Sequence, residues 1–329
     1  MEKLKIGVLG SGDIATRISK TILHMEEIEL YAVASRTYDH AKTFGEKFGY
    51  KKIYMAYEEV IQDPEVDIVY IALHHTQHYE FAKKCLAYHK PVLCEKPFTI
   101  NRYQAEELIW EFAEKGIFLN EALWTRFIPS KNKILKILED GLIGEPKMID
   151  VNMICRICDN IRMTDINMGG GALLDLGVYA LNFVSMFFGN DVEDMKTMVS
   201  FWETGVDEQE VFIMKYPQGK IAVCKVSMVG NGSVEGIIYG TAGRIEISDV
   251  MNLGHVKVYN LQNEVVEEFF AAEGTTGYEY EFLACKKALE NGLTECEEMP
   301  HSETMFLMKQ YDRLRAAWGF DYPCEKGLN

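Results

Sequence analysis

The first residues suited to chemistry are those of a G-x-G-x-x-A motif, Gly10, Gly12 and Ala15. Gly10 permits a tight turn, Gly12 lets a pyrophosphate approach the backbone, and Ala15 allows close packing of a helix on a strand. A helix that begins with Asp13 and Ile14 would offer its free N–H groups to phosphate. The motif alone is a weak signal, since glycines often only mark a turn. Because an apolar run precedes it and a helical pattern follows it, we expect a dinucleotide-binding turn rather than a plain strand–turn–helix.

A second candidate for cofactor recognition is the pair Ser35-Arg36, which follows the strand-like run 28–34. Folds of this kind carry an acidic residue here to bind the ribose 2′-hydroxyl of NAD. A carboxylate would repel a 2′-phosphate, whereas a hydroxyl and a guanidinium would bind one. The pair therefore favours NADP. The alternative is that Arg36 is a solvated surface charge and that the pocket accepts either cofactor.

A lysine suited to proton and charge transfer, Lys96, lies in the run Glu95-Lys96-Pro97. The run ends a predicted strand, beside the expected position of the nicotinamide, so we count both Glu95 and Lys96 among the cofactor-site residues. A lysine there can orient a substrate hydroxyl or carbonyl and stabilise negative charge. By spacing alone, a Glu–Lys surface pair before a helix explains the run equally well.

Two further chemical side chains, Asp175 and Tyr179, follow three glycines at 169–171. Three glycines let the backbone pass close to a ligand or to another segment. Asp175 and Tyr179 are four residues apart in a predicted helix, so they share a face and can reach one pocket. The alternative is a simple loop followed by a core tyrosine. Upstream, Trp124 and Arg126 belong to an aromatic and basic cluster at the domain junction, and we expect them to line the cofactor and substrate pocket.

A histidine-rich loop, with His74, His75 and His78, follows the apolar run 66–73. No Cys, Asp or Glu lies at metal-ligand spacing from these histidines, so we expect no metal site. Ligands of such sheets bind at the carboxyl ends of the strands, so we expect Leu73, His74 and His78 to contact the cofactor. The alternative for His78 is a helix-start residue that contacts nothing.

The elements that position these residues alternate between strand and helix up to residue 122. Apolar runs at 28–34, 66–73 and 91–97, with helical patterns between them, predict a doubly wound parallel sheet. Short β-like runs from 192 to 268, separated by turns at Pro217–Gly219 and Gly240–Gly243, predict an antiparallel meander. A strand is expected at 147–158 and two helices at 277–290 and 302–318. We expect the tail after Trp318 only to finish the chain.

The composition is that of a globular protein, with 48% apolar and 26% charged residues. The 329 residues exceed one core, so two domains are expected. A net charge of −16 argues against a nucleic-acid partner and against an anionic membrane. No signal-peptide pattern or membrane span is visible, and the cysteines are scattered, which indicates reduced thiols in the cytoplasm. Cys155 and Cys158 would point to opposite faces of the strand at 147–158, so we expect no disulfide between them.

Five motifs occur in a fixed order: the Gly10/Gly12/Ala15 turn, Ser35-Arg36, Glu95-Lys96-Pro97, EALWTRF and GGGALLDLGVY. In this combination the chain resembles the glucose–fructose oxidoreductase/inositol dehydrogenase (Gfo/Idh/MocA) family. The form of the EALWTRF motif and Tyr179 resemble the dimeric dihydrodiol dehydrogenase-like branch of that family. The motifs extend from residue 5 to about residue 182, and no single one of them is specific.

The resemblance implies an α/β architecture with two domains. Residues 1–122 would form a Rossmann domain with a parallel sheet. Residues 123–329 would form an α+β domain with a large open, mostly antiparallel sheet, and its last helices would pack back on the first domain. The implied activity is hydride transfer between NADP, or NAD, and a CH–OH or C=O group of a sugar, polyol or cyclic diol. A homodimer or larger assembly through the C-terminal sheets is also implied, and an exposed apolar sheet face favours it.

The resemblance further implies that Tyr179 is the general acid/base. A neutral tyrosine has a pKa near ~10, too high for a base at neutral pH, but a nearby ammonium lowers that pKa. Lys96 would supply the ammonium, and Asp175 would orient Lys96 or a substrate hydroxyl. The competing function is a non-catalytic, NADP-binding redox sensor or regulator, which keeps the glycine turn but loses the lysine and the acid/base residue. Because all three residues are present here, we favour the enzyme.

Overall fold

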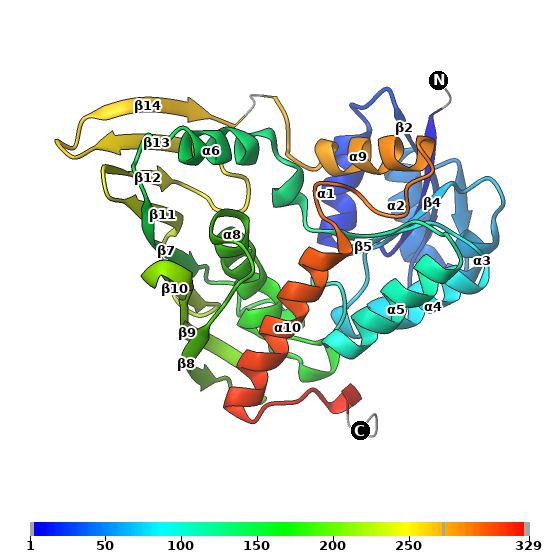
Figure 1. Ribbon diagram of the computed structural model, residues 1–329. Helices are drawn as coiled ribbons and strands as arrows, with labels where there is room; N and C mark the ends of the chain where they lie inside the picture. The colour runs from blue at the N-terminus through cyan, green and yellow to red at the C-terminus, as the bar shows by residue number, and fades with distance from the viewer. Residues whose placement is uncertain (1–2, 272–273, 326–329) are drawn as a thin grey trace. The chain divides into compact units, whose positions relative to one another are not determined.

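The computed structural model describes residues 3–271 and 274–325 (Figure 1). These residues form two compact units. The first unit comprises Met1–Leu123 and Thr275–Met308, and the second comprises Trp124–Gly274 and Lys309–Asn329. The chain therefore returns to the first unit after building most of the second, and helix α10 (His301–Trp318) runs from one unit into the other.

The first unit is built on a parallel sheet of six strands in the order β3-β2-β1-β4-β5-β6. The strands are β1 (Leu4–Leu9), β2 (Ile28–Ala34), β3 (Lys52–Tyr54), β4 (Ile68–Ile71), β5 (Val92–Glu95) and β6 (Leu119–Ala122). The helices are α1 (Asp13–Ile22), α2 (Tyr38–Phe48), α3 (Tyr57–Gln62), α4 (His78–Ala87), α5 (Arg102–Glu114) and α9 (Glu279–Glu290). This strand order is that of the Rossmann fold, as predicted.

The strand order reverses between β1 and β4, which lie side by side at the centre of the sheet. Ligands of open α/β sheets bind outside the carboxyl ends of the strands at such a reversal. The segments that leave these two strands are the glycine turn after Leu9 and the histidine-rich loop after Ile71. The fold therefore places both predicted cofactor segments at the expected edge.

The second unit contains a sheet of eight strands in the order β14-β13-β12-β11-β7-β10-β9-β8. The strands are β7 (Pro146–Ile154), β8 (Asp194–Phe201), β9 (Asp207–Lys215), β10 (Ile221–Ser227), β11 (Val234–Gly240), β12 (Gly243–Ile247), β13 (His255–Asn260) and β14 (Val265–Phe270). The helices are α6 (Pro129–Glu139), α7 (Ile161–Thr164) and α8 (Val178–Phe188). Both predicted turns join antiparallel neighbours, β9 to β10 and β11 to β12.

The predicted single meander is wrong in one respect. β7 lies between β10 and β11, parallel to β10 and antiparallel to β11. Two meanders, β8 to β10 and β11 to β14, therefore flank a central strand that comes from earlier in the chain. The sheet remains mostly antiparallel, as predicted.

Helix α8 covers one face of this sheet (Figure 1). Gly236 on β11 makes room for it, since a Cβ there would lie 2.5 Å from Cζ of Phe183 on the helix. One described segment, Ile166–Phe188, is long and apolar enough to cross a membrane by length and composition, but 89% of its most apolar window is buried inside the protein. A core helix passes the same test, and α8 is such a helix.

Two expectations about the second unit are wrong. The strand expected at 147–158 ends at Ile154, so Cys155 and Cys158 lie beyond it and the argument from opposite strand faces does not apply to them. Both thiols are nevertheless free. The tail after Trp318 does more than finish the chain. Its Tyr322 is fully buried and donates a hydrogen bond from Oη to the carbonyl oxygen of Gly170 at 2.7 Å.

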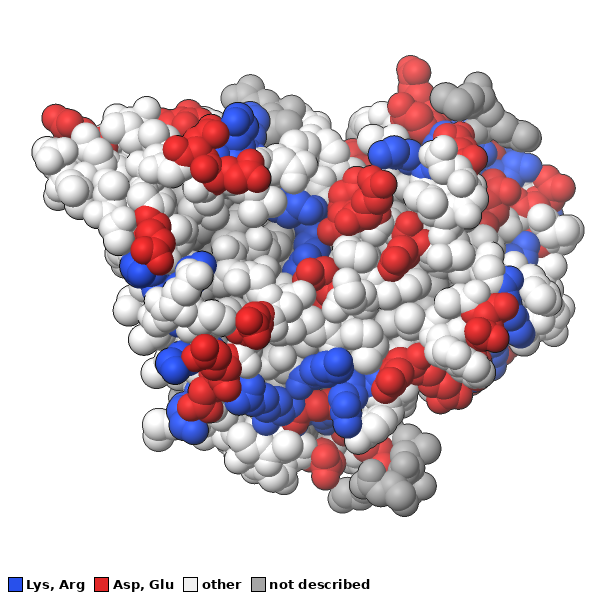
Figure 2. All heavy atoms as spheres, in the orientation of Figure 1, with Lys and Arg blue, Asp and Glu red and all other residues white. Residues whose placement is uncertain are grey.

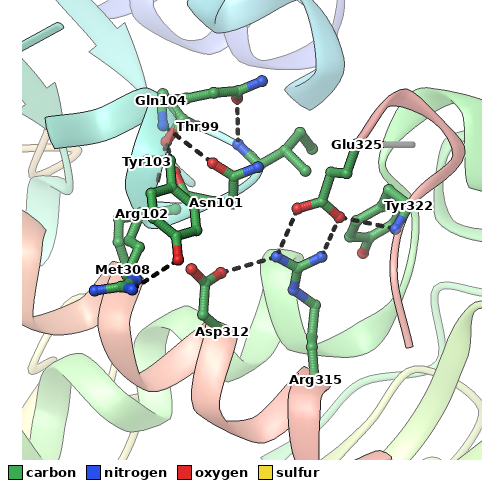
Figure 3. A network of polar contacts seen from close by, with 11 residues as sticks. Thr99, Asn101, Arg102, Tyr103, Gln104, Met308, Asp312, Arg315, Tyr322 and Glu325 are labelled. Atoms are coloured by element: carbon green, nitrogen blue, oxygen red, sulfur yellow. Dashed lines mark hydrogen bonds and ion pairs between the residues drawn. The ribbon is translucent and has the colours of Figure 1, made fainter. Parts of the chain in front are cut away.

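The tail is held by a buried arginine of α10 (Figure 3). The Arg315 guanidinium donates to both carboxylate oxygens of Glu325, at 2.5 and 3.1 Å, and to Asp312 at 2.8 Å. The backbone N–H of Tyr322 also donates to Glu325 at 2.8 Å. Elsewhere, on the face drawn in Figure 2, acidic and basic side chains are interspersed.

Candidate active site

The glycine turn of the first unit has the geometry that a dinucleotide site requires. Gly10 has φ of +113°, and a Cβ there would lie 2.4 Å from the carbonyl oxygen of Ala72, so this position excludes any side chain. Gly12 precedes α1, and a Cβ on Gly12 would meet nothing within 4 Å, so its surroundings are open. No side chain caps this end of α1 among the described residues. Ala15 is fully buried beneath it. The free N–H groups of α1, beginning at Asp13, can therefore donate hydrogen bonds to a pyrophosphate.

The pair after β2 is divided between a buried and an exposed residue. Ser35 is buried, and its hydroxyl lies 2.7 Å from that of Ser11 in the glycine turn. Arg36 is exposed and makes no hydrogen bond or ion pair with any residue in the described parts of the chain. Its positive charge lowers the pKa of Tyr57, although burial raises that pKa by more. An exposed guanidinium at this edge is available to a 2′-phosphate, and its role in binding one stays a prediction.

The histidine-rich loop is fastened by His78, the first residue of α4. His78 is fully buried, and its ring nitrogens lie 2.9 Å from the carbonyl oxygen of Pro97 and 3.2 Å from that of Leu73. Burial lowers the pKa of His78 to about 4, so the ring is neutral at pH 7 and donates only one of these two hydrogen bonds. The alternative of a histidine that contacts nothing is wrong. His78 joins the segments after β4 and β5, while cofactor contacts by Leu73, His74 and His78 stay predictions.

The end of β5 places Lys96 beside a buried carboxylate. Glu95 is buried, accepts a hydrogen bond from the hydroxyl of Tyr70, and accepts another from the backbone N–H of Lys96 at 3.1 Å. The alternative of a surface Glu–Lys pair is therefore wrong for Glu95. Its side chain fixes the backbone from which the half-buried Lys96 side chain leaves the sheet.

In the second unit, Tyr179 accepts a hydrogen bond that the sequence did not reveal. The indole Nε1–H of Trp124 donates to the Tyr179 oxygen at 3.1 Å, and both residues are buried. An indole nitrogen can only donate. Because a donated hydrogen bond stabilises the phenolate more than the phenol, this contact favours ionisation of Tyr179.

Arg126 lies in the same short helical segment, Trp124–Phe127, and also contacts α8. Its Nε donates to Oδ1 of Asn182 at 2.6 Å, and its second terminal nitrogen donates to Oγ of Ser185 at 2.8 Å. The segment therefore fastens the helix that carries Tyr179 at three side chains. The predicted cofactor and substrate contacts of Trp124 and Arg126 stay predictions.

Asp175 has a cationic partner that the sequence analysis missed. Arg162 on α7 donates to both of its carboxylate oxygens, at 2.9 and 3.2 Å. Such a bidentate pair fixes the plane of the carboxylate. Asp175 lies in a π-helical turn, Leu173–Gly177, rather than in the regular α-helix that we expected. Turns of this kind occur frequently at functional sites. Its role in orienting Lys96 stays a prediction.

The glycines before this turn approach other segments of the protein. A Cβ on Gly170 would lie 2.6 Å from the carbonyl oxygen of Met163, and one on Gly171 would lie 2.3 Å from Oδ1 of Asp207. Of the two reasons considered for three glycines, close passage of another segment is the one that the structure shows. Within residues 3–271 and 274–325, no three His, Cys, Asp or Glu side chains lie close enough together to hold a metal ion.

A Rossmann sheet with an uncapped glycine turn defines a dinucleotide-binding protein. Models of two protein domains match the chain: "Oxidoreductase family, NAD-binding Rossmann fold" over residues 4–122 and "GFO/IDH/MocA C-terminal domain" over residues 132–246. The chain belongs to the Gfo/Idh/MocA oxidoreductase family. It is accordingly an NAD(P)-dependent oxidoreductase that acts on hydroxyl or keto groups, and the family resemblance of its motifs is confirmed.

Its curated relatives include the trans-1,2-dihydrobenzene-1,2-diol dehydrogenases of Bos taurus and Homo sapiens. The bovine protein is 32% identical over 98% of this chain and 99% of its own length. The human protein is 30% identical with the same coverage, 98% and 99%. Among solved structures, KijD10, a 3-ketoreductase from Actinomadura kijaniata in complex with NADP and TDP-benzene, is 26% identical. Its TM-score is 0.86, over 96% of this chain and 98% of that one.

Proposed function

We propose that the chain oxidises a vicinal diol, such as trans-1,2-dihydrobenzene-1,2-diol, or a sugar hydroxyl, and reduces the corresponding carbonyl, with NADP as its preferred cofactor. The observation that carries the proposal is the hydrogen bond from Trp124 to the Tyr179 oxygen, at 3.1 Å, in the family motif where an acid/base is expected. The diol dehydrogenases and the NADP-bound ketoreductase to which the chain is similar support the substrate class and the cofactor.

In the proposed chemistry, a cofactor held at the glycine turn would supply the nicotinamide ring as hydride acceptor or donor. Tyr179 removes the proton from the substrate hydroxyl during oxidation and returns it during reduction. The positive charge of Lys96 and the N–H of Trp124 both stabilise the phenolate that this requires. Arg162 holds the Asp175 carboxylate in a fixed plane, from which it orients the substrate hydroxyl or Lys96.

The substrate class is tested by following nicotinamide absorbance while the protein is incubated with a panel of diols, polyols and sugars. We expect turnover of trans-1,2-dihydrobenzene-1,2-diol or of a sugar, and faster turnover with NADP than with NAD. If the protein binds NADP but transforms no member of the panel, the result would favour the alternative function, a non-catalytic redox sensor or regulator, over the enzyme.

Arg36→Ala tests the cofactor preference. An exposed guanidinium that binds the 2′-phosphate is worth a charge-assisted hydrogen bond, so we expect NADP affinity to fall by about ten-fold or more. NAD lacks that phosphate, so its affinity should hardly change. Titration of both cofactors into the wild type and the variant measures this. Equal or tighter binding of NAD by the wild type would refute the preference.

We also propose a homodimer through the face of the second unit's sheet that α8 does not cover. This face exposes apolar side chains on both sides of β10: Met198 at 80%, Val211 at 42% and Ile213 at 45% on β8 and β9, and Met148 at 39% on β7. Such a patch is typical of an interaction surface. The eight unpaired cysteines support a reducing, cytoplasmic location.

A further inference from the structure

The turn that precedes Tyr179 is bounded by two buried carboxyl groups from one strand. Both belong to β9 and neither has a part in the proposed chemistry. Asp207 lies at the start of the π-helical turn, where its Oδ2 accepts a hydrogen bond from the Leu173 N–H at 2.6 Å. Glu210 lies at the end of the turn, where its Oε1 is 3.3 Å from the position of a Cβ on Gly177.

The Asp207 carboxylate is the cap of the helix that continues into α8. The first N–H groups of a helix have no partner within it and favour a negative charge. The N–H groups of Ala172 and Leu173 both face Asp207. Gly171, at φ of +120°, is the residue that admits the carboxylate, since any Cβ there would collide with it.

We infer that Asp207 is a positioning residue for the acid/base: its ionised carboxylate holds the π-helical turn, and through it sets Asp175 and Tyr179 for reaction. This inference rests on the proposed function, because it presumes that Tyr179 moves the proton. We call the contact between the Asp207 carboxylate and the N–H groups at the start of this turn the clamp. Protonation of Asp207 removes the negative charge from the helix start and weakens the clamp. Activity therefore falls on acidification through a group that never touches the substrate.

The surroundings of Asp207 determine where it titrates. Burial raises the pKa of Asp207 to about 6, against the hydrogen bonds from backbone N–H groups and the positive charge of Arg315, which lower it. Glu210 faces it from the same strand, and burial raises the pKa of Glu210 well above its usual range, which favours its neutral form. Tyr322, from the tail, is fully buried nearby, and burial raises its pKa.

Stability and activity should then depend on pH in opposite directions. The pKa of Asp207 is higher in the folded chain than in the unfolded chain, so protonation favours folding. Its contribution to stability is fully present below the unfolded pKa of ~3.9 and is lost as the pH rises through about 6. The clamp, by contrast, requires the ionised form, which prevails above that pH. A residue with a merely structural role would move activity and stability together.

The test compares wild type with Asp207→Asn, which keeps the shape and an acceptor oxygen but cannot ionise. The matched control is Glu210→Gln, which makes the same kind of change at the other buried carboxyl group of β9. Amide hydrogen exchange of residues 171–179, corrected for the intrinsic rate, is measured between pH 5 and 8. We expect wild-type and Glu210→Gln protection to fall below about pH 6. Protection in Asp207→Asn should be lower at pH 7.5 and independent of pH.

Turnover and unfolding are measured on the same three proteins, with NADP and the best substrate of the panel. We expect kcat of Asp207→Asn to be lower by about ten-fold at pH 7.5, as when a charge-assisted hydrogen bond becomes a neutral one, and the acid limb near pH 6 to vanish. Relative to wild type, the variant should gain stability as the pH rises from about 4 to 7.5.

Two outcomes separate this inference from the proposed function. If Asp207→Asn keeps the wild-type exchange and kcat profiles, while Tyr179→Phe loses turnover, the clamp is refuted and the proposed chemistry stands. If Tyr179→Phe keeps full turnover, or no panel member reacts, the proposed function fails, and the exchange profile still decides whether Asp207 clamps the turn.

Discussion

At the scale of single residues, the decisive feature is the environment of one phenolic oxygen. Tyr179 lies buried at the start of α8, where the Trp124 indole donates to its oxygen. An acid/base must be held in one orientation and its pKa must approach the working pH. The indole hydrogen bond serves both needs, because it fixes the ring and favours the phenolate.

Trp124→Phe tests this contact. Phenylalanine keeps an aromatic ring but removes the donor that stabilises the phenolate, so ionisation of Tyr179 should become less favourable. In the direction of alcohol oxidation Tyr179 acts as a base, so the limb along which kcat rises with pH should move to higher pH. The measurement is kcat against pH for wild type and variant.

The control for this variant is Trp110→Phe, the same change at an exposed position of α5. It should leave the profile where it is. If the rise of kcat with pH occurs at the same pH in Trp124→Phe as in the wild type, the indole does not govern the ionisation that limits turnover.

The sequence points to candidate residues for the site but not to their partners. Lys96, Asp175 and Tyr179 stand out because their types suit proton transfer and because they lie in family motifs. Arg162, which pairs with Asp175, precedes it by 13 positions in an irregular stretch without a recognisable pattern. Asp207 is still more remote, since its hydrogen bond to Leu173 spans 34 residues. Pairings of this kind are set by tertiary packing, which periodicity does not encode.

At the scale of elements, the glycine run before the π-helical turn decides how α8 begins. Gly171 lies against the Asp207 carboxylate. Its role is therefore to admit a side chain of the protein itself to the start of the helix.

Gly171→Ala should lower the free energy of unfolding by two separate effects. A positive φ alone costs alanine ~1–2 kcal/mol. The Cβ would also lie 2.3 Å from Oδ1 of Asp207, which adds a steric cost. Gly141→Ala is the matched control, because Gly141 also has a positive φ, +71°, but no atom within 4 Å of an added Cβ.

Denaturant unfolding of both variants measures the difference. We expect Gly171→Ala to be the less stable by more than about 1 kcal/mol, because its Cβ collides and because its φ of +120° lies outside the left-handed region that Gly141 occupies. Equal losses in the free energy of unfolding would mean that the loop rearranges to accommodate the added Cβ and that the Asp207 carboxylate is not tightly held.

Several elements followed from the sequence with bounds close to those observed, because apolar runs and turn residues act locally. The predicted strand at 28–34 coincides with β2, and the predicted helices at 277–290 and 302–318 correspond to α9 and α10. The pairing of β7 between β10 and β11 did not follow, because parallel pairing joins segments about 70 residues apart and leaves no local signal. The buried tail was missed because its anchoring residues, Tyr322 and Glu325, are isolated.

At the scale of the whole molecule, the feature that bears on the proposed homodimer is the face of the second unit's sheet that α8 does not cover. In the register of the sheet, Ile213, Val223 and Asp150 lie side by side on β9, β10 and β7. Asp150 is paired with Lys225 at 2.8 Å. The face thus carries apolar side chains beside compensated charge pairs, since Arg244 and Glu246 on β12 form another pair at 2.7 Å.

Ile213→Glu should dissociate the proposed dimer, because a carboxylate buried without a partner is costly. Light scattering at micromolar concentration should give about twice the chain mass of 37.6 kDa for wild type and a single chain for the variant. Leu293→Glu, at a similarly exposed position in the first unit, is the control and should remain dimeric. A monomeric wild type would refute the dimer.

The central claim is that this oxidoreductase uses Tyr179 as its acid/base, and turnover of Tyr179→Phe tests it most directly. Loss of the proton-transfer group should lower kcat by ~10²–10⁴-fold while the affinity for NADP is unchanged. Lys96→Met, measured alongside, should also lose turnover. If Tyr179→Phe turns over at the wild-type rate while Lys96→Met does not, another group moves the proton and the account is wrong.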